Sequence, residues 1–549
     1  MSDQPERFCD LVMKGGITSG IVYPKAVCEL AKQFSFRSIG GTSAGAIAAA
    51  VSAAAEHGRR KGLDSFRKLE GLPEILGGTG AGGKGSFLFT LFQPQPRFAR
   101  LFRVLTGMLG AKRPAWALVS GLARNYWLAT GLSLLTGALF FRALVPNAQG
   151  WQLAAAALAV IVVFAATFIL AIALLVRGDC KKLRGNLFGF CTGMPNPKIG
   201  GDSLTPWLDA LINDYAGKPG TEPLTFGDLW ENTEAGGEKR VCLEMMTTCL
   251  THGRPYRLPF DQHIFYFREE EFRQLFPAGA VDWMVAHPSA ASDRYEGFVA
   301  MPDAANLPVI VATRMSLSFP ILFSAIPLYA VDFSRADVPR KPEVCWFSDG
   351  GICNNFPVQL FDSPLPRWPT FAINLLPWDP LRNEEQSRVV AKGGTPPEPE
   401  MVYLPGRNQG GILEAWNRFD LSADGHPKGG LGAVTGFVGS ILNAMQNWVD
   451  NRQIRIPGYR DRVAHVYLKP EEGGLNLNMP ASVIEAVSAR GGEAGRQLSD
   501  RFRVGSTHPM NWDNHRWVRF RSTMAGLEEF LTKILRGYTD TVSARPFRS

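Results

Sequence analysis

The chain has 549 residues, of which 46% are hydrophobic, and this is ample for at least one large core. Such a composition excludes an intrinsically disordered protein. The net charge of +8 and the sequence pI near 9.0 favour an anionic partner, either a lipid surface or a nucleic acid, without choosing between them.

The first sixty residues alternate between strand and helix patterns. Short apolar runs predict strands at 8–13 and 34–39, and helical patterns cover 21–33 and the alanine-rich 44–57. Strands that alternate with helices indicate an α/β fold whose sheet is mostly parallel and flanked by helices. We assign residues 1–85 to the first part of this domain.

Residues 86–125 form a basic segment with an amphipathic pattern. From 92 to 126 the chain contains no Asp or Glu, and apolar residues recur at the i, i+3, i+4, i+7 spacing of one helix face. The apolar residues are Phe98, Leu101, Phe102 and Leu105, and the basic residues are Arg97, Arg100, Arg103, Lys112, Arg113 and Arg124. We interpret the segment as a helix at a membrane interface, with an ordinary surface helix covering a core as the alternative.

Residues 126–176 contain two apolar stretches, Tyr126–Val145 and Trp151–Val176, with only five residues between them. Each is long enough to cross a bilayer, for which about 20 residues are needed. They predict a transmembrane hairpin, whereas two buried core helices joined by a tight turn are the alternative. Arg142 lies four residues before Pro146, where its side chain can reach the interface.

The flanks of this hairpin predict its orientation. Basic residues precede the first stretch and follow the second, whereas the connecting loop has none. Because basic residues stay cytoplasmic, we expect a protein with two spans and a cytoplasmic domain. The amino terminus shows no apolar core of signal-peptide length, so no secretion signal is expected.

The α/β pattern resumes after the hairpin. Residues 177–382 contain predicted strands at 241–248, 307–313 and 369–376. This pattern indicates that the hairpin is an insertion within one domain.

The remainder of the chain divides into two parts. Residues 383–434 are rich in Gly, Pro and charge and predict a loop or linker. Residues 435–549 predict an α/β extension, with helices at 435–452 and 525–536 and a strand at 463–468.

The eight cysteines include no CxxC pair and no Cys/His cluster at zinc-finger spacing, and the eight histidines are scattered. This pattern favours free thiols in a reducing compartment. We expect no metal and no cofactor.

Gly41-Thr42-Ser43-Ala44-Gly45 has the form G-x-S-x-G and stands between a predicted strand and the alanine-rich helix. Glycines on both sides of the serine permit a sharp turn that exposes its hydroxyl, and the helix N-terminus favours developing negative charge. The motif predicts a reactive Ser43, with a purely structural turn as the alternative.

Two further glycine motifs accompany this serine. Gly15 and Gly16 follow the first predicted strand, where paired glycines let backbone N–H groups point at an oxyanion. Far downstream, Asp349 follows an apolar run and precedes Gly350 and Gly351, which free it to approach another loop. Such a carboxylate can activate a serine.

Taken in this order, the three motifs resemble the patatin-like phospholipase family. The segment Met315-Ser316-Leu317-Ser318-Phe319-Pro320-Ile321-Leu322-Phe323 also looks like that family's small-residue helix before a Pro and a Phe. The resemblance covers about 8–60 and 240–376. It implies a patatin-like sheet, here interrupted by the transmembrane hairpin.

The resemblance implies a Ser-Asp dyad, with Ser43 as nucleophile, Asp349 as base, and an oxyanion hole near Gly15, Gly16 and Ile17. Ile17 stands where the family shows a third glycine, and Ser19 where it shows a basic residue. The function implied is a membrane-associated lipid acyl hydrolase of the phospholipase A or lysophospholipase type, acting on membrane lipids.

Two other functions remain open. An α/β-hydrolase with a Ser-Asp-His triad would use one of the histidines that follow Asp349, namely His465, His508 or His515. A catalytically silent membrane scaffold would keep the fold without the activity.

Two further segments resemble ligand-binding motifs, but other interpretations are favoured for both. Gly78–Ser86 comes close to a P-loop, but no strand precedes it and Gly85 replaces the required Ser or Thr, which favours a flexible loop. Aromatic and basic residues alternate in 511–520, where contact with lipid headgroups or simple packing is favoured, and no nucleic-acid partner is expected.

Overall fold

The computed structural model describes residues 7–539, with gaps at 17, 81–82, 84, 110–113, 145–149, 219, 232–239, 335–339, 379–400, most of 407–457, 470–471 and 474–475. Its centre is an eleven-stranded sheet in the order β12-β13-β11-β1-β2-β4-β10-β9-β6-β7, with β5 paired to β4, and β3 and β8 form a small second sheet. The strands are β1 (Phe8–Met13), β2 (Ser35–Gly41), β3 (Gly189–Cys191), β4 (Cys242–Cys249), β5 (Arg254–Leu258), β6 (Tyr266–Phe267), β7 (Val299–Ala300), β8 (Ile321–Phe323), β9 (Ile326–Val331), β10 (Pro342–Ser348), β11 (Thr370–Pro377), β12 (Val402–Tyr403) and β13 (Val463–Leu468).

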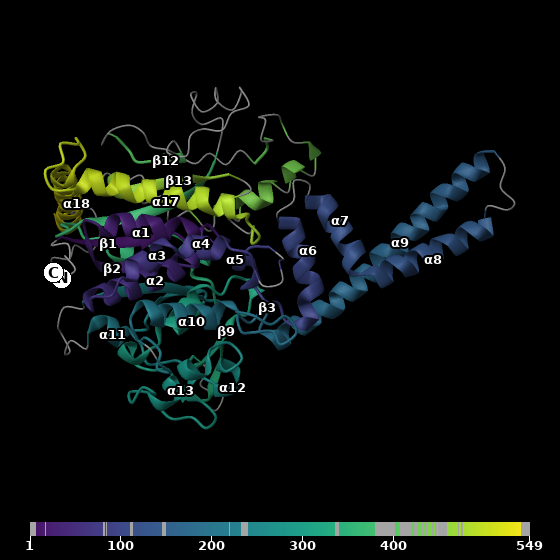
Figure 1. Cartoon of the computed structure of the whole chain (residues 1–549), viewed down its shortest axis with the longest axis horizontal. Coiled ribbons are helices and arrows are strands. Elements are labelled where there is room, and N and C mark those ends of the chain that lie inside the picture. Colours follow the sequence, from purple (N-terminus) through teal and green to yellow (C-terminus); the bar gives the residue numbers. More distant parts are fainter. Residues whose placement is uncertain are drawn as a thin grey trace.

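Helices cover this sheet, and α8 and α9 extend beyond it (Figure 1). They are α1 (Tyr23–Ala31), α2 (Ala44–Arg60), α3 (Ser65–Glu70), α4 (Leu72–Gly77), α5 (Phe87–Thr90), α6 (Ala99–Leu109), α7 (Pro114–Asn125), α8 (Trp127–Leu144), α9 (Trp151–Leu183), α10 (Leu204–Tyr215), α11 (Phe226–Trp230), α12 (Glu269–Phe272), α13 (Ala278–Ala286), α14 (Val309–Ser316), α17 (Ala481–Phe502) and α18 (Trp512–Thr539). The fold is therefore α/β, as predicted.

The sheet is mixed, which corrects the prediction of a mostly parallel one. Only the neighbouring strands β13, β11, β1, β2 and β4 run parallel to one another. The pairs β4–β10, β4–β5, β9–β10, β6–β9, β6–β7 and β12–β13 are antiparallel. β4 leads directly into β5, and a short connection without a crossover helix permits only antiparallel pairing.

Most predicted elements that fall on described residues form where expected, but one does not. The apolar run 307–313, predicted as a strand, lies mostly in helix α14, which begins at Val309. Every residue of α14 is buried, so no alternation of polar and apolar residues marks its period. A short buried run of this kind has no pattern that separates strand from helix.

The carboxyl-terminal region completes the central sheet. β13 pairs with β11, and α17 runs alongside α1 (Figure 1). A Cβ at Gly491 would lie 1.8 Å from the carbonyl oxygen of Val22, and one at Gly495 would lie 2.4 Å from that of Ala26. The two glycines thus allow close contact between the helices. The predicted linker 383–434 and the predicted helix 435–452 lie largely outside the described residues.

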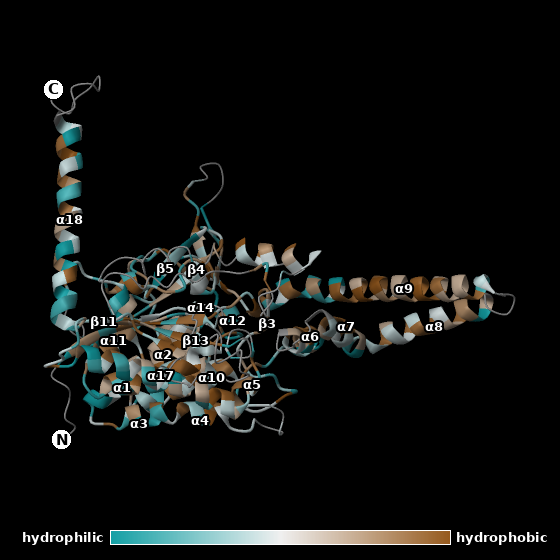
Figure 2. Cartoon of the chain, turned by 90° about the horizontal axis from the view of Figure 1, so that it is seen from above, coloured by the Kyte–Doolittle hydropathy of each residue, from teal (hydrophilic) through white to brown (hydrophobic). Residues whose placement is uncertain are grey.

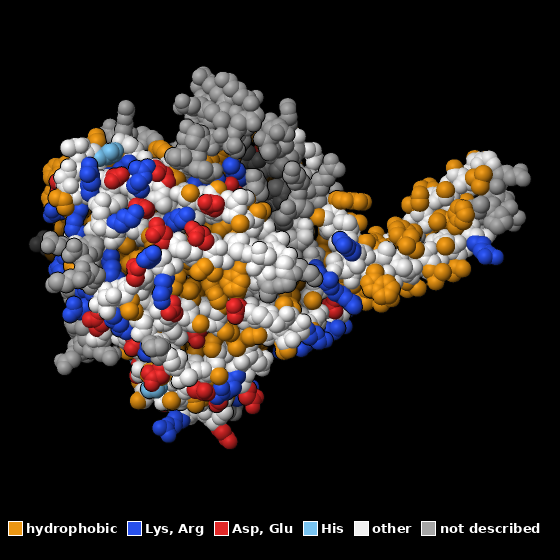
Figure 3. Space-filling view, in the orientation of Figure 1, with side chains coloured by type: hydrophobic (Ala, Val, Ile, Leu, Met, Phe, Trp, Pro, Cys, Tyr) orange, Lys and Arg blue, Asp and Glu red, His pale blue; other side chains and the backbone are white. Residues whose placement is uncertain are grey.

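α8 and α9 project together away from the body (Figures 1 and 3). Among the described residues, one helix is long and apolar enough to cross a membrane, Trp151–Asn186, and only 6% of its most apolar window is buried. The neighbouring helix over Trp127–Ala143 is apolar but shorter. Figure 2 shows α9 to be hydrophobic along most of its length. α9 is therefore not a core helix.

The basic segment before the hairpin packs differently from its prediction. Phe98 and Phe102 are buried in the main core, where Phe98 packs against Phe190 and Phe102 stacks with Phe89. This part of the amphipathic face covers the domain, as in the alternative interpretation. Because a side chain in a packed core cannot also enter lipid, the prediction of an interfacial helix is wrong for these two residues.

Candidate active site

Ser43 occupies a strained turn between β2 and α2. Its φ of 55° and ψ of −129° lie where a residue with a side chain is uncommon. A Cβ at Gly41 would lie 2.4 Å from the carbonyl oxygen of Gly45, and a Cβ at Gly45 would lie 2.3 Å from that of Met13. Because any Cβ at these two positions would clash, only glycine allows the turn to pack against the end of β1. This packing maintains the position of Ser43.

Asp349 lies at the end of β10, and its backbone is tied to neighbouring segments. Its N–H donates to the carbonyl oxygen of Ser318 at 3.0 Å, and its Oδ1 accepts the N–H of Gly351 at 2.7 Å. A Cβ at Gly350 would lie 2.0 Å from the carbonyl oxygen of Met246 in β4. Gly350 thus lets the Asp349 loop lie against the central sheet.

The carboxyl of Asp349 is buried and borders Ser43. Burial raises the pKa of Asp349 to about 7, whereas the Ser43 hydroxyl, the Gly351 N–H and the charge of Arg314 lower it. Among the described residues, no donor meets the geometric criteria for a hydrogen bond to Oδ2. The Ser43 hydroxyl is close enough to lower the pKa of this carboxyl, but it is not aligned for such a bond. A carboxyl with a pKa near neutrality can both accept and return a proton.

The glycine loop after β1 lies against the same turn. A Cβ at Gly15 would lie 3.0 Å from Ser43 Cβ, and one at Gly16 would lie 2.3 Å from Ser19 Oγ. The Gly15 N–H donates to the carbonyl oxygen of Asn355 at 2.9 Å, so this donor already has an acceptor. Gly16 N–H has no backbone acceptor among the described residues, and Ile17 lies outside them.

Asn355 connects the three motifs, although the sequence analysis gave it no role. Its carbonyl oxygen accepts the Gly15 N–H and, at 3.0 Å, the hydroxyl of Thr42. A Cβ at Gly351 would lie 2.7 Å from its Oδ1. The only sequence signal for Asn355 is its place directly after the Asp-Gly-Gly motif.

The comparisons with known proteins agree with this geometry. A family model described as patatin-like phospholipase matches residues 11–362.

The chain belongs to the patatin-like phospholipase family.

Membership supports lipid hydrolysis as its activity. The RpoH suppressor of Rhizobium meliloti (strain 1021) is 37% identical over 596 residues, which cover 97% of this chain and 88% of that protein. Among solved structures, VipD from Legionella pneumophila matches with 15% identity and a TM-score of 0.30 over 90% of this chain and 67% of VipD. The ExoU-SpcU complex of Pseudomonas aeruginosa matches with 16% identity and a TM-score of 0.19, over 70% and 46%.

In this patatin-like phospholipase, a buried arginine supports the Asp349 loop. Arg314 Nη1 donates to Ser318 Oγ at 2.7 Å, and Nη2 donates to the carbonyl oxygens of Thr192 and Ser324, both at 3.1 Å. Burial lowers the pKa of Arg314 to about 10, so it remains charged at neutral pH, and its charge lowers the pKa of Asp349. No role for Arg314 was predicted from the sequence. Its place within an apolar run was the one indication that it is buried and has a specific role.

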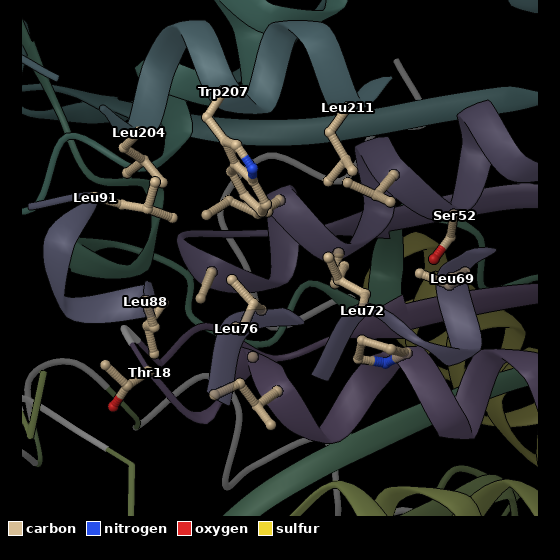
Figure 4. A pocket seen from close by; sticks show the side chains of 17 residues that line it. Thr18, Ser52, Leu69, Leu72, Leu76, Leu88, Leu91, Leu204, Trp207 and Leu211 are labelled. Atoms are coloured by element: carbon tan, nitrogen blue, oxygen red, sulfur yellow. The ribbon is translucent and has the colours of Figure 1, made fainter. Parts of the chain in front are cut away.

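An apolar pocket follows one face of α2, starting at Ala44, the residue after Ser43 (Figure 4). Thr18 and Gly20 of the glycine loop also line it, and a Cβ at Gly20 would lie 3.2 Å from the Cβ of Ala44. Figure 4 shows Leu204, Trp207 and Leu211 of α10 on one side, with Leu72 and Leu76 opposite. The remaining lining residues are Ile21, Pro24, Ala44, Ile47, Ala48, Val51, Ser52, Leu69, Leu88 and Leu91. The lining side chains are almost all apolar.

The three histidines considered for a triad have partners of their own. The ring of His465 lies 3.2 Å from Asn374 Nδ2 in β11, and the ring of His515 lies 2.6 Å from Asp461 Oδ2. His508 Nδ1 accepts the N–H of Met510 at 3.0 Å. These contacts hold the histidines in the carboxyl-terminal region and give a triad no support.

Proposed function

We propose that this patatin-like phospholipase cleaves carboxylic esters of membrane lipids, as a phospholipase A or a lysophospholipase. The observation that carries the proposal is the position of Ser43, which borders the buried carboxyl of Asp349 and directly precedes Ala44, a lining residue of the apolar pocket. A reactive hydroxyl, a proton acceptor and a site for an acyl chain are three of the parts that lipid ester hydrolysis needs.

The reaction would proceed in two steps through an acyl-enzyme. Ser43 Oγ attacks the ester carbonyl carbon while its proton passes to Asp349, and the proton then goes to the leaving alcohol as the acyl–oxygen bond breaks. In the second step a water molecule gives a proton to Asp349 and attacks the Ser43 ester, which releases the fatty acid and returns the hydroxyl proton.

Developing negative charge on the carbonyl oxygen needs nearby N–H donors. We assign this role to Gly16 and Ile17 of the glycine loop, because the Gly15 N–H is used by Asn355. The N–H of Ala44, at the first turn of α2, also has no partner within its helix. The Ser43 N–H is less suited, since it donates to Ser316 Oγ at 3.2 Å.

α8 and α9 would hold the domain on the membrane as a two-span hairpin. α8 has 18 residues and would be about 27 Å long, close to the hydrocarbon thickness of a bilayer. Both helices expose large apolar side chains, including Leu132, Leu139, Leu158 and Ile169. Lys and Arg side chains gather where the helices meet the body (Figure 3), which supports a cytoplasmic domain.

The decisive experiment compares the lipids of membranes exposed to the wild type and to Ser43→Ala. We expect free fatty acid and either a lysophospholipid or a glycerophosphodiester to accumulate only with the wild type. A lysophospholipid product would indicate the phospholipase A type, and its consumption the lysophospholipase type. Identical lipid profiles for the two proteins would contradict the proposal.

A further inference from the structure

The tertiary structure brings together two cysteines and a histidine outside the candidate active site. Donor atoms of Cys249, His252 and Cys345 all lie within 4.8 Å of one another. Cys249 ends β4, His252 follows it in the turn toward β5, and Cys345 lies in β10, which pairs with β4. The spacing of the cysteines along the sequence predicts no zinc site, because spacing cannot show a ligand that comes from a distant strand.

We propose that Cys249, His252 and Cys345 bind a zinc ion. Two thiolates and an imidazole form the soft donor set that zinc prefers. With Zn–S bonds of about 2.3 Å and Zn–N bonds of about 2.0 Å, a tetrahedral site places sulfur and nitrogen about 3.5 Å apart. The distance between Cys345 Sγ and His252 Nε2 is 3.5 Å. This pair therefore has the spacing of two ligands on one ion.

The surroundings of His252 direct its Nε2 toward the sulfurs. Its Nδ1 lies 2.6 Å from the hydroxyl oxygen of Tyr256, and this oxygen also accepts from Arg254 at 2.7 Å. When Nδ1 carries the proton and donates to Tyr256, Nε2 presents a lone pair to the metal. A second partner of this kind accompanies almost every metal-binding histidine.

The site combines a protected sulfur side with an open imidazole side. Cys249 and Cys345 are buried, whereas His252 is exposed and its ring stacks with Phe265. The backbone N–H of His252 donates to Cys249 Sγ at 3.4 Å, a contact that stabilises a thiolate. An ion can arrive from the His252 side, where a water molecule can supply the fourth ligand.

A zinc ion here would fasten the strand that leads to Asp349. Phe347 pairs with Cys249 and Ser348 with Thr248, and Asp349 follows directly. The ion would join the end of β4 to β10 four residues before Asp349. Its role is structural, since the cluster adds no group to the Ser43 pocket.

The experiment measures the metal content of the full-length protein in detergent, purified without a polyhistidine tag or chelator. We expect about one zinc per chain in the wild type and loss of that zinc in His252→Ala and Cys345→Ser. Cys242→Ser, on the same strand β4, and His263→Ala are the controls and should keep the metal. Replacing zinc by cobalt should give the absorption of thiolate-to-cobalt charge transfer.

A second variant keeps the test informative if the ligand variants fail to fold. Tyr256→Phe retains all three ligands but removes the partner of His252 Nδ1, and we expect zinc affinity to fall about 10- to 100-fold. The proposal is overturned if the wild type holds no more zinc than Cys345→Ser, if it holds another metal, or if mass spectrometry of unreduced peptides finds a Cys249–Cys345 disulfide. Unchanged zinc affinity in Tyr256→Phe would overturn the role of that residue.

Discussion

The carbonyl oxygen of Asn355 accepts the N–H of Gly15 at 2.9 Å, so the segment after Asp349 is tied directly to the amino-terminal glycine loop. The same carbonyl accepts the hydroxyl of Thr42, the neighbour of Ser43. One residue thus fixes the relative positions of three loops, and any movement of the Asp349 loop would reach the Ser43 turn through it.

Ser43→Ala should abolish ester hydrolysis while the protein remains folded. The nucleophile of a serine hydrolase can contribute as much as ~10⁶ to turnover, and alanine keeps the Cβ that the turn accommodates. The measurement is the turnover of a lipid ester together with labelling by a serine-reactive fluorophosphonate. Ser334→Ala, in an exposed loop, serves as the control and should behave as the wild type. Wild-type turnover in Ser43→Ala would place the active serine elsewhere.

Asp349→Asn should lose nearly all activity. In the wild type, the rate should vary with pH according to the protonation state of the Asp349 carboxyl. Because burial raises the pKa of Asp349 to about 7, the carboxylate that accepts the Ser43 proton is present above pH 7 and is lost as the pH falls through 7. A pH profile of kcat/KM should therefore rise with a midpoint near 7.

The histidines provide the comparison for this prediction. His465→Ala, His508→Ala and His515→Ala should each keep most of the activity if they remain folded. His515 and His465 are buried and hydrogen-bonded, so circular dichroism must accompany the assay. A folded histidine variant as inactive as Ser43→Ala would replace the dyad by a triad.

Arg314→Met should shift the acid limb of the pH profile to higher pH. The charge of Arg314 lowers the pKa of Asp349, so its removal leaves the carboxyl protonated over a wider range. Arg314→Lys keeps the charge but not the three hydrogen bonds, and its midpoint should stay near that of the wild type. If both variants had a lower kcat/KM but the same midpoint of the pH profile as the wild type, the role of Arg314 would be limited to supporting the loop.

Ala48→Phe should restrict the length of the acyl chain. Ala48 lies on the face of α2 that lines the pocket, one turn beyond Ala44, and a phenyl ring there would fill part of the pocket. Each methylene that can no longer be buried costs about 0.8 kcal/mol, so long-chain esters should lose far more kcat/KM than butyrate esters. Ile47→Leu conserves volume and is the control. An equal loss for both chain lengths would argue against an acyl pocket here.

The two-span hairpin that we propose predicts opposite locations for two sulfhydryls. In intact bacteria that express the protein, a membrane-impermeant maleimide should label Ala148→Cys, which lies in the sequence between the two apolar stretches. The native Cys180, exposed near the end of α9, should react only after the cells are broken. Labelling of Cys180 in intact cells, or release of the protein by alkaline carbonate, would contradict the predicted topology.

The sequence by itself determined the features that depend on neighbouring residues. The G-x-S-x-G turn, the strands at its flanks and the Asp-Gly-Gly loop could be predicted because local backbone requirements select glycine at these positions. The exposed apolar helix α9 could be predicted because its length and composition need no partner to be recognised. Strand β13 also formed at its predicted residues, because its apolar pattern is continuous.

Only the tertiary structure decided which segments meet. Phe98 and Phe102 have the spacing of an amphipathic face, but what covers that face depends on Phe89 and Phe190, which come from other segments. The support of Asp349 by Arg314 likewise comes from packing between distant segments. Cys249 and Cys345 meet because β4 and β10 pair in the sheet, and the spacing along the chain carries no trace of that pairing. Contacts between residues distant in sequence arise from burial of apolar surface in three dimensions, which a one-dimensional pattern does not contain.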